Sequence, residues 1–559
     1  MTTPATAALL YAPDGYDTSR PRLMGRHAAG EGFLKALIQH AGFDRLVALT
    51  RTAEDEAAFR TQCLALGATM PLEAVAETAL HRLAETGCLM LPGPELSHHA
   101  WRRRRIGAAR GFSLVGITHT IASATAMDSL ADLLVAPVQP WDAVICTSAA
   151  VRGAVQRLWQ AEGEYLARRL GASRLEGPAL PVIPLGVDVP ALARDPAARR
   201  DWRGRLGVAA DDMVVLHHGR LSFHAKAHPL PMFLALGRAA AAAPPGVAVH
   251  LVLSGWFADA VQRNAFKAMA AALCPALAVH HVDGRKPEVR RAIWSAADIF
   301  TLLSDNIQES FGLAPVEAMA SGLPVVAADW DGLRDTVAHG VTGFRIPTLM
   351  AGPMEDLAAR HEAGQDSYDH YIAGAAQFTA VDVGAAEVAF AALIGDAGLR
   401  ARMSAAALDR ARTIYEWSVV IGQYRALWAE LAALRGAGRG ERVALLRGEN
   451  PVPRRPDPGR LFADFPTQRL APETRLRLAP GLPDAAAALA RLRAIAAIPG
   501  GAARPDLLPG ADAFGVMLSG LEAGPAQAGA LVAALPPPHA AQCFRALAWL
   551  VKVDVLRLA

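Results

Sequence analysis

Short apolar stretches alternate with longer helical patterns along most of this 559-residue chain, and this alternation restricts the fold more than any other feature. In the first half the apolar stretches cover residues 6–12, 44–49, 88–91, 112–118, 143–147 and 181–185. In the second half they cover residues 213–218, 247–254, 277–282, 299–303, 325–328 and 344–346. Buried strands with room for crossover helices between them are typical of parallel sheets. The pattern therefore predicts two doubly wound α/β domains, residues 1–190 and 191–435, with ligands bound in the cleft between them, beyond the carboxyl ends of the strands.

The remainder of the chain differs in composition. A helical pattern over residues 417–434 is expected to close the second domain, and residues 436–470 have the glycine, proline and arginine content of a linker. Residues 471–559 show alanine- and leucine-rich helical patterns, which predict a small helical domain that folds separately. Three roles stay open for this domain: binding a protein partner, forming a homo-oligomer, and packing against the rest of the chain.

Charge and cysteine content exclude several classes of protein. The 56 Lys and Arg residues nearly balance the 53 Asp and Glu residues, so the net charge of +3 does not indicate a nucleic-acid partner. The five cysteines lack CxxC spacing, which argues against a disulfide framework or a zinc site and favours the reducing cytoplasm. Residues 1–11 do not resemble a signal peptide, and no apolar stretch approaches the ~20 residues needed to span a bilayer. We therefore expect a folded cytoplasmic protein.

A basic cluster lies in the first domain. Residues 101–105 read Trp-Arg-Arg-Arg-Arg, with His98, His99 and Arg110 close by. Such a face can contact anionic lipid or another anionic partner, which would place the protein at the inner face of a membrane. A solvated helix face is the alternative interpretation.

Residues 309–317, Glu-Ser-Phe-Gly-Leu-Ala-Pro-Val-Glu, hold two carboxylates on either side of a turn that becomes a helix. Phe311, Gly312 and Leu313 stand where the helix starts, so their backbone N–H groups are free to bind a phosphate. Glu317 lies further along the helix, where its carboxylate can accept hydrogen bonds from a ribose diol. Glu309 precedes the helix and can bind hydroxyls beyond the phosphates. This order predicts a nucleotide-sugar site; a buried amphipathic helix with two incidental glutamates is the alternative.

This E-x7-E segment resembles the signature of retaining glycosyltransferases of the GT-B fold, in particular the group 1 (family 4) class. The pieces that follow it, residues 322–326, 331–332 and 340–344, match the same pattern. The resemblance implies two Rossmann-like domains facing a cleft. It also implies a Leloir-type hexosyltransferase that moves a sugar from a nucleotide diphosphate sugar, UDP-sugar first among them, to an acceptor. The acceptor can be a glycan, a lipid or a protein, and no metal or other cofactor is expected.

The resemblance extends to further residues. Arg220 and Lys226, which follow the stretch 213–218, correspond to the family's two cations that neutralise the leaving diphosphate, although Lys226 lies six positions after Arg220 where the family has five. His119 corresponds to a first-domain histidine near the reacting sugar, and residues 184–188 to a hinge. The implied catalytic residues are Glu309, His119, Arg220 and Lys226, and the implied donor-binding residues are Glu317, Phe311, Gly312, Leu313, Gly25, Gly219 and Ser304.

Each of these assignments has a plainer alternative. Arg220 and Lys226 can be solvated loop cations, His119 a satisfied core histidine, and the glycines around Gly25 an ordinary turn and helix start. The four histidines near Arg220 match no usual zinc motif. Two other functions remain: a catalytically silent nucleotide-sugar-binding scaffold that acts through residues 471–559, and a nicotinamide-dependent oxidoreductase. The second is disfavoured because no predicted strand is followed by a G-x-G-x-x-G turn.

Overall fold

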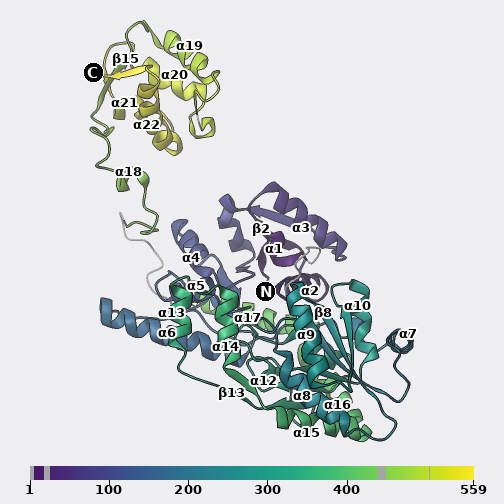
Figure 1. Ribbon diagram of the computed structural model, residues 1–559. Coiled ribbons are helices and arrows are strands. Elements are labelled where there is room, and N and C mark those ends of the chain that lie inside the picture. Colours follow the sequence, from purple (N-terminus) through teal and green to yellow (C-terminus); the bar gives the residue numbers. More distant parts are fainter. Residues whose placement is uncertain (1–5, 18–24, 438–448, 503) are drawn as a thin grey trace. The chain divides into compact units, whose positions relative to one another are not determined.

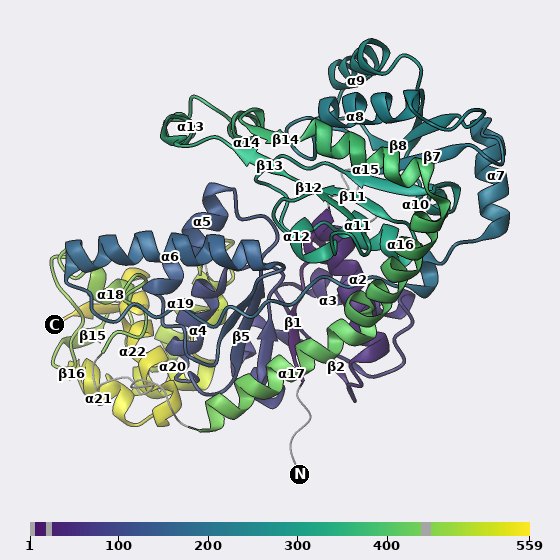
Figure 2. The same cartoon turned by 90° about the horizontal axis from the view of Figure 1, so that it is seen from below.

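The computed structural model describes residues 6–17, 25–437, 449–502 and 504–559, and the chain forms two compact units, Met1–Val452 and Pro453–Ala559. The first unit contains two six-stranded parallel sheets (Figures 1 and 2). The sheet of the first domain has the strand order β3 (Leu72–Ala76), β2 (Leu46–Thr50), β1 (Ala8–Leu10), β4 (Cys88–Met90), β5 (Ser113–Ile117) and β6 (Ala143–Ile145). The sheet of the second domain has the order β12 (Gly343–Ile346), β11 (Val325–Ala328), β10 (Ile299–Leu302), β7 (Met213–Arg220), β8 (Val249–Trp256) and β9 (Ala278–Asp283). The predicted pair of doubly wound α/β domains is confirmed.

Helices connect the strands. The first domain has α1 (Pro13–Tyr16), α2 (Gly25–His40), α3 (Ala53–Ala65), α4 (Leu96–Arg105), α5 (Ala124–Ala131) and α6 (Ala149–Leu170). The second has α7 (Pro196–Leu206), α8 (Pro229–Ala241), α9 (Ala260–Leu273), α10 (Pro287–Ala292), α11 (Leu313–Ala320), α12 (Leu333–Thr336), α15 (Val383–Gly395) and α16 (Ala397–Arg410). Between β12 and α15 the chain adds β13 (Thr348–Met350), α13 (Glu355–Glu362), α14 (Tyr368–Gln377) and β14 (Thr379–Val381).

The last helix of the first unit, α17 (Trp417–Gly436), returns to the first domain (Figure 2). Its buried residues Trp417, Tyr424 and Trp428 belong to the same apolar cluster as Leu9 of β1 and Phe33 of α2. Successive residues of a strand point to opposite faces, so the neighbours of Leu9 contribute to a second cluster on the other face of the sheet. The helix expected over 417–434 is therefore present, and it completes the core of the first domain.

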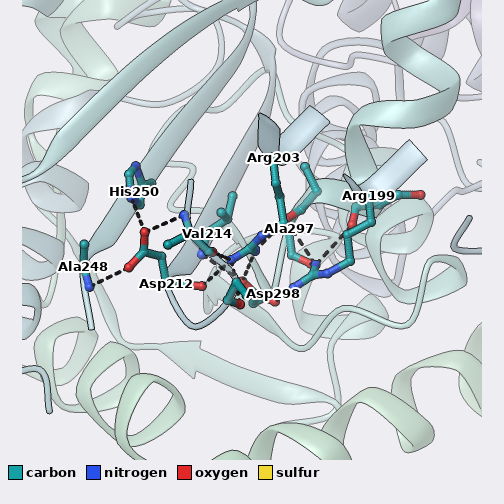
Figure 3. A network of polar contacts seen from close by, with 12 residues as sticks. Arg199, Arg203, Asp212, Val214, Ala248, His250, Ala297 and Asp298 are labelled. Atoms are coloured by element: carbon teal, nitrogen blue, oxygen red, sulfur yellow. Dashed lines mark hydrogen bonds and ion pairs between the residues drawn. The ribbon is translucent and has the colours of Figure 1, made fainter. Parts of the chain in front are cut away.

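A buried polar network holds the amino-terminal end of β7 (Figure 3). Arg203 of α7 donates hydrogen bonds to the backbone oxygens of Ala209 and Asp212, at 2.5 and 2.7 Å, and to the Asp298 carboxylate at 3.2 Å. That carboxylate also accepts a hydrogen bond from Val214 N at 2.9 Å. Because Arg220 lies at the other end of this strand, roughly 23 Å away at 3.3 Å per residue, the network stabilises the domain without taking part in the cleft.

Two details of the predicted strands are wrong. Residues 181–185 do not form a strand: Ala179 and Val182 make isolated bridges to the neighbouring strand region, and Pro181 and Pro184 have no N–H to extend the ladder. Conversely, β3 is a strand at the sheet edge that the pattern of apolar residues does not reveal.

The second unit contains the predicted helices together with a small sheet. Its helices are α18 (Pro458–Leu461), α19 (Ala485–Ala496), α20 (Ala511–Ser519), α21 (Ala528–Ala533) and α22 (Pro537–Lys552). Strands β16 (Ala526–Gln527), β15 (Arg475–Leu478) and β17 (Leu556–Leu558) form an antiparallel sheet that was not predicted. The unit has an apolar core of its own, which includes Leu476, Met517 and Leu547. Across the described residues of the whole chain, no helix combines the length and apolar character needed to cross a bilayer.

Candidate active site

The candidate site lies where the strand order of the second sheet reverses, between β7 and β10. In open α/β sheets the crevice at such a reversal is the usual place for a ligand, beyond the carboxyl ends of the strands. Strand β7 ends in Gly219 and Arg220, and the chain after β10 contains Ser304 and Glu309. Gly219 has a φ of +148°, and a Cβ atom there would lie 3.2 Å from Cε of Lys226. The glycine therefore allows the Lys226 side chain to lie across the end of the strand.

Lys226 and Glu309 form a shielded ion pair. Lys226 Nζ lies 2.6 Å from Glu309 Oε2, and the two side chains are only 17% and 12% exposed. The additional residue between Arg220 and Lys226 thus does not separate the lysine from the E-x7-E segment. In the absence of a ligand, each charge compensates the other; a bound diphosphate would offer Lys226 a second anionic partner.

Asn306 fixes the geometry of this pair and was not identified from the sequence. Its Nδ2 donates to the Lys226 carbonyl at 2.5 Å, and its Oδ1 accepts from the backbone N–H groups of Gln308 and Glu309 at 3.0 and 3.2 Å. Ser304 Oγ donates to the same Lys226 carbonyl at 3.0 Å. The predicted donor-binding role of Ser304 stays a prediction, because its hydroxyl is already used to position the lysine loop.

Arg220 lies beside the pair. Its Nη2 donates to the Ala225 carbonyl at 3.1 Å, which leaves further guanidinium N–H groups for a ligand. Burial lowers the pKa of Arg220, and the carboxylates of Glu309 and Asp369 oppose that shift. The cation is thus poorly solvated, and a guanidinium in such surroundings forms strong charge-assisted hydrogen bonds with a phosphate.

Helix α11 begins next to these cations, as predicted for the chain after Glu309. Its N-cap residue Gly312 has a φ of +86°, and no side chain caps the helix. A Cβ atom at Gly312 would lie 2.3 Å from Leu333 Cδ2, so packing as well as backbone conformation requires glycine. Phe311 is buried and its ring packs at 6.1 Å from that of Tyr415. Phe311, Gly312 and Leu313 can therefore offer a ligand their backbone N–H groups.

Glu317 lies in the second turn of α11, half-buried among apolar neighbours. Burial raises the pKa of its carboxyl group to about 7, and the opposing charges of Lys226 and Arg290 do not cancel the effect. Arg290 comes from α10 and was not identified from the sequence. Four charged residues of the second domain thus lie near one another, Arg220, Lys226, Glu309 and Glu317, and their roles stay predictions.

The raised pKa of Glu317 predicts a pH-dependent effect of Glu317→Gln. An unfolded glutamate ionises near pH 4.5, whereas the folded carboxyl group keeps its proton to about pH 7. Its contribution to stability is therefore complete below pH 4.5 and is lost as the pH rises through 7. Glutamine imitates the protonated form, so the Tm of the variant relative to wild type should be higher at pH 8 than at pH 5. Thermal unfolding without ligand checks this, and an equal difference at both values would contradict it.

The first domain contributes His119, which follows β5. Its Nε2 lies 3.0 Å from the Pro92 carbonyl oxygen, and the ring borders a small apolar cavity of about 30 Å³ lined by Tyr16, Leu185 and Trp417 among others. This placement suits a histidine that takes part in the site, and it equally suits one that only packs in the core. Its catalytic role stays a prediction.

The glycines that follow the first strand lie in helix α2. Gly25 is the first residue of α2, and its donor-binding role stays a prediction. A Cβ atom at Gly30 would lie 2.0 Å from the Gly15 carbonyl oxygen, and one at Gly32 would lie 3.1 Å from the Trp417 ring. Gly30 and Gly32 therefore permit close packing of α2 against α1 and α17.

The two domains meet next to the E-x7-E segment. Ala149 N, at the start of α6, donates to Asp335 Oδ2 at 2.6 Å, and Ser148 Oγ donates to Asp331 Oδ1 at 3.3 Å. Asp331 has a φ of +42°, and burial, with the nearby Glu309 charge, raises the pKa of its carboxyl group to about 7. The side chains of Asp331 and Asp335 thus lie at the N-terminus of α6, the positive end of the helix dipole. This arrangement stabilises the contact between the domains.

The remaining histidines and the basic cluster have local partners. His218 Nδ1 lies 3.1 Å from Ser254 Oγ, and His228 caps α8. Among the described residues, no three His, Cys, Asp or Glu side chains come together in a way that could hold a metal ion. Of the cluster at 101–105, Arg103 pairs with buried Asp142, Arg102 with Glu77 and Arg104 with Glu449. Arg102, Arg103 and Arg104 are thus engaged within the chain.

Part of the chain matches a known protein family. Residues 198–376 match the family described as glycosyl transferases group 1. The D-inositol 3-phosphate glycosyltransferase of Nocardia farcinica is 34% identical over 190 residues, which cover 33% of this chain and 39% of the relative. The protein of the same name from Corynebacterium efficiens is 41% identical over 100 residues, 16% of this chain and 23% of the relative. The chain therefore spans about a quarter to two fifths of the length of these curated relatives.

Solved structures with a related arrangement are more distant in sequence. Sucrose-phosphate synthase from Thermosynechococcus elongatus aligns with a TM-score of 0.48 and 17% identity, over 77% of this chain and 100% of that chain. Anabaena Alr3699/HepE in complex with UDP aligns with a TM-score of 0.48 and 19% identity, over 76% and 99%. The two parallel sheets and their strand order are those of the GT-B fold. Residues 198–376, which match the description glycosyl transferases group 1, lie within a chain of this fold.

Proposed function

We propose that the protein is a retaining glycosyltransferase of the family 4 type. It takes a hexose-type sugar from a nucleotide diphosphate sugar, with UDP-sugar as the first candidate, and transfers it to an acceptor hydroxyl. The sugar donor is bound by the second domain, and the acceptor enters from the side of the first domain.

One observation carries this proposal. Two cations, Arg220 and Lys226, lie together with a helix start that has no side-chain cap and with a carboxylate, Glu317, further along the same helix. The cations and the free N–H groups suit a diphosphate, and the carboxylate suits a ribose diol. Among common metabolites, a nucleoside diphosphate combines these groups in this order, and a glycosyltransferase uses it as the leaving group.

These residues would promote the reaction mainly by electrostatic stabilisation of the leaving group. The bond between sugar C1 and the phosphate oxygen breaks while a bond between C1 and the acceptor oxygen forms on the same face. The acceptor proton passes to the departing phosphate. Arg220, Lys226 and the start of α11 stabilise the negative charge that grows on the diphosphate. In this proposal Glu309, which pairs with Lys226 in the structure, binds sugar hydroxyls once the diphosphate has replaced it as the partner of Lys226.

Ligand binding and turnover test the proposal separately. A thermal-shift comparison of UDP, GDP and ADP identifies the base, because a ligand that binds the folded protein raises its Tm. Release of UDP from UDP-glucose, with inositol 3-phosphate as the first acceptor because the matched relatives are named for it, tests transfer. Proton NMR of the product reports the anomeric configuration. Nucleotide binding without any turnover would favour the silent scaffold instead.

Replacing Glu317 with alanine should weaken nucleotide binding more than it slows the chemical step. A lost hydrogen bond to a charged group costs about 1.5–3 kcal/mol, so the Kd for the nucleotide should rise roughly 10- to 100-fold. Isothermal calorimetry with Glu317→Ala measures this, and Glu288→Ala, at an exposed position of α10, is the control. An unchanged Kd for Glu317→Ala would refute the assignment of Glu317 to the ribose.

A further inference from the structure

The segment between β12 and α15 leaves the second sheet and extends to the first domain. It begins and ends in two antiparallel strands, β13 and β14, in which Thr348 pairs with Val381. Between these strands lie α13 and α14, which Figure 2 shows projecting beyond the second sheet on the side of α5. The segment is called the excursion here, residues 348–381. No pattern in the sequence pointed to its role.

Helix α14 of the excursion contacts both domains. Its Ile372 is fully buried and packs in one small apolar cluster with Ala122 of the first domain and Ala225 of the second. Ala225 is the residue whose carbonyl accepts the hydrogen bond from Arg220. Tyr368, the first residue of α14, packs against the same cluster. The excursion therefore places an aromatic side chain beside the cation that is expected to hold the diphosphate.

The hydroxyl of Tyr368 is buried without a hydrogen-bond partner of standard geometry among the described residues. A hydrogen bond that its oxygen accepts from Thr120 and the charge of Arg220 lower its pKa, but burial outweighs them and raises it. The hydroxyl therefore stays protonated at neutral pH, and its own proton lacks an acceptor of standard geometry among the described residues. A buried polar group without a partner costs about 1–3 kcal/mol, and native proteins leave few such groups. A ligand that accepts a hydrogen bond would remove this cost.

We propose that the Tyr368 hydroxyl donates a hydrogen bond to the diphosphate of the bound nucleotide, so that α14 provides a phosphate contact in addition to those of Arg220 and Lys226. This inference rests on the proposed function, since it concerns the same ligand. It favours the diphosphate over the acceptor because Arg220, the neighbour of Tyr368, is the natural partner of a phosphate. Tyr368 then selects for the diphosphate part of the nucleotide and not for its base.

The test compares UDP and uridine binding to Tyr368→Phe by calorimetry. The substitution keeps the ring and its packing against Ile372, and removes only the hydroxyl. The Kd for UDP should rise about 10-fold, as expected for loss of a hydrogen bond to a charged group, while the Kd for uridine should not change. Tyr371→Phe is the matched control, because its ring lies one turn further along α14, stacked on His361 at 4.9 Å. Its affinity for UDP should equal that of wild type.

The outcomes separate this inference from the proposed function. If the wild-type protein binds none of UDP, GDP and ADP, the proposed function is refuted. If wild type binds UDP and Tyr368→Phe binds it equally well, the phosphate contact is refuted and the proposed function stands. A shift in Tm of Tyr368→Phe without any change in UDP affinity would mean that the hydroxyl only joins the domains through Thr120, which also overturns the inference.

Discussion

Replacing Arg220 with alanine is expected to lower kcat for sugar transfer by about two to three orders of magnitude. Removal of one preorganised donor that stabilises charge in a transition state typically has an effect of this size. Arg220 is held by the Ala225 carbonyl and poorly solvated, so its guanidinium needs little reorganisation when charge grows on the leaving diphosphate. Steady-state kinetics with UDP-glucose, or with the nucleotide sugar that the binding screen selects, measures kcat and KM separately.

The kinetic pattern decides the role of Arg220. A residue that binds donor and transition state equally well would raise KM and leave kcat unchanged, and this result would refute a role in leaving-group stabilisation. Arg220→Lys should recover only part of the rate, because lysine keeps the charge but lacks the planar bidentate donors. Arg205→Ala, which removes an exposed arginine of α7, serves as the control and should leave both constants unchanged.

Asp142→Ala is expected to destabilise the first domain by about 3–5 kcal/mol, the usual cost of breaking a buried ion pair. Asp142 is fully buried and accepts hydrogen bonds from Arg103 at 2.7 and 2.6 Å, from Leu114 N at 2.7 Å and from Gln139 N at 2.7 Å. The substitution leaves the Arg103 charge buried without its partner. Urea unfolding followed by circular dichroism compares the variant with wild type.

The matched control for this experiment is Asp201→Ala. Asp201 pairs with Arg205 on α7, and the two side chains are 53% and 61% exposed. An exposed pair contributes about 0–1 kcal/mol, so this variant should unfold at nearly the wild-type urea concentration. If both variants lowered the urea concentration at the midpoint of unfolding by a similar amount, burial of the Arg103–Asp142 pair would have no special effect on stability.

The strands were predictable where both faces of the strand are buried. β8 lies within the predicted stretch 247–254 apart from its last two residues, because a long apolar run has few interpretations other than a buried strand. β3 was missed since it lies at the sheet edge, where Leu72, Glu73 and Ala74 are only half-buried. Its sequence therefore lacks the apolar run on which the prediction depended.

The residues of the candidate site also differ in how far the sequence could identify them. The E-x7-E segment was recognisable because its residues are close in sequence and their function depends on the local start of a helix. Asn306, Arg290 and Tyr368 were not recognisable, since the contact that brings each of them to the site is with a residue distant in the chain. Tyr368 lies near Arg220 only because the excursion packs against Ala122 and Ala225, and nothing in the local sequence of α14 indicates this. Long-range packing, and not local propensity, decides such positions.

The chain enters and leaves the second domain at one place. Val187 N donates to the Tyr415 carbonyl at 2.8 Å, Trp417 N donates to the Val187 carbonyl at 3.1 Å, and Glu416 accepts a hydrogen bond from Val189 N at 2.9 Å. Residues 189–415 are thus a continuous insert whose ends lie side by side, while α17 stays with the first domain. Recombination at these two positions would exchange the second domain for that of another protein of this fold and leave the core of the first domain whole. Under the proposed function, the half that binds the donor and the half that faces the acceptor would then change independently of each other.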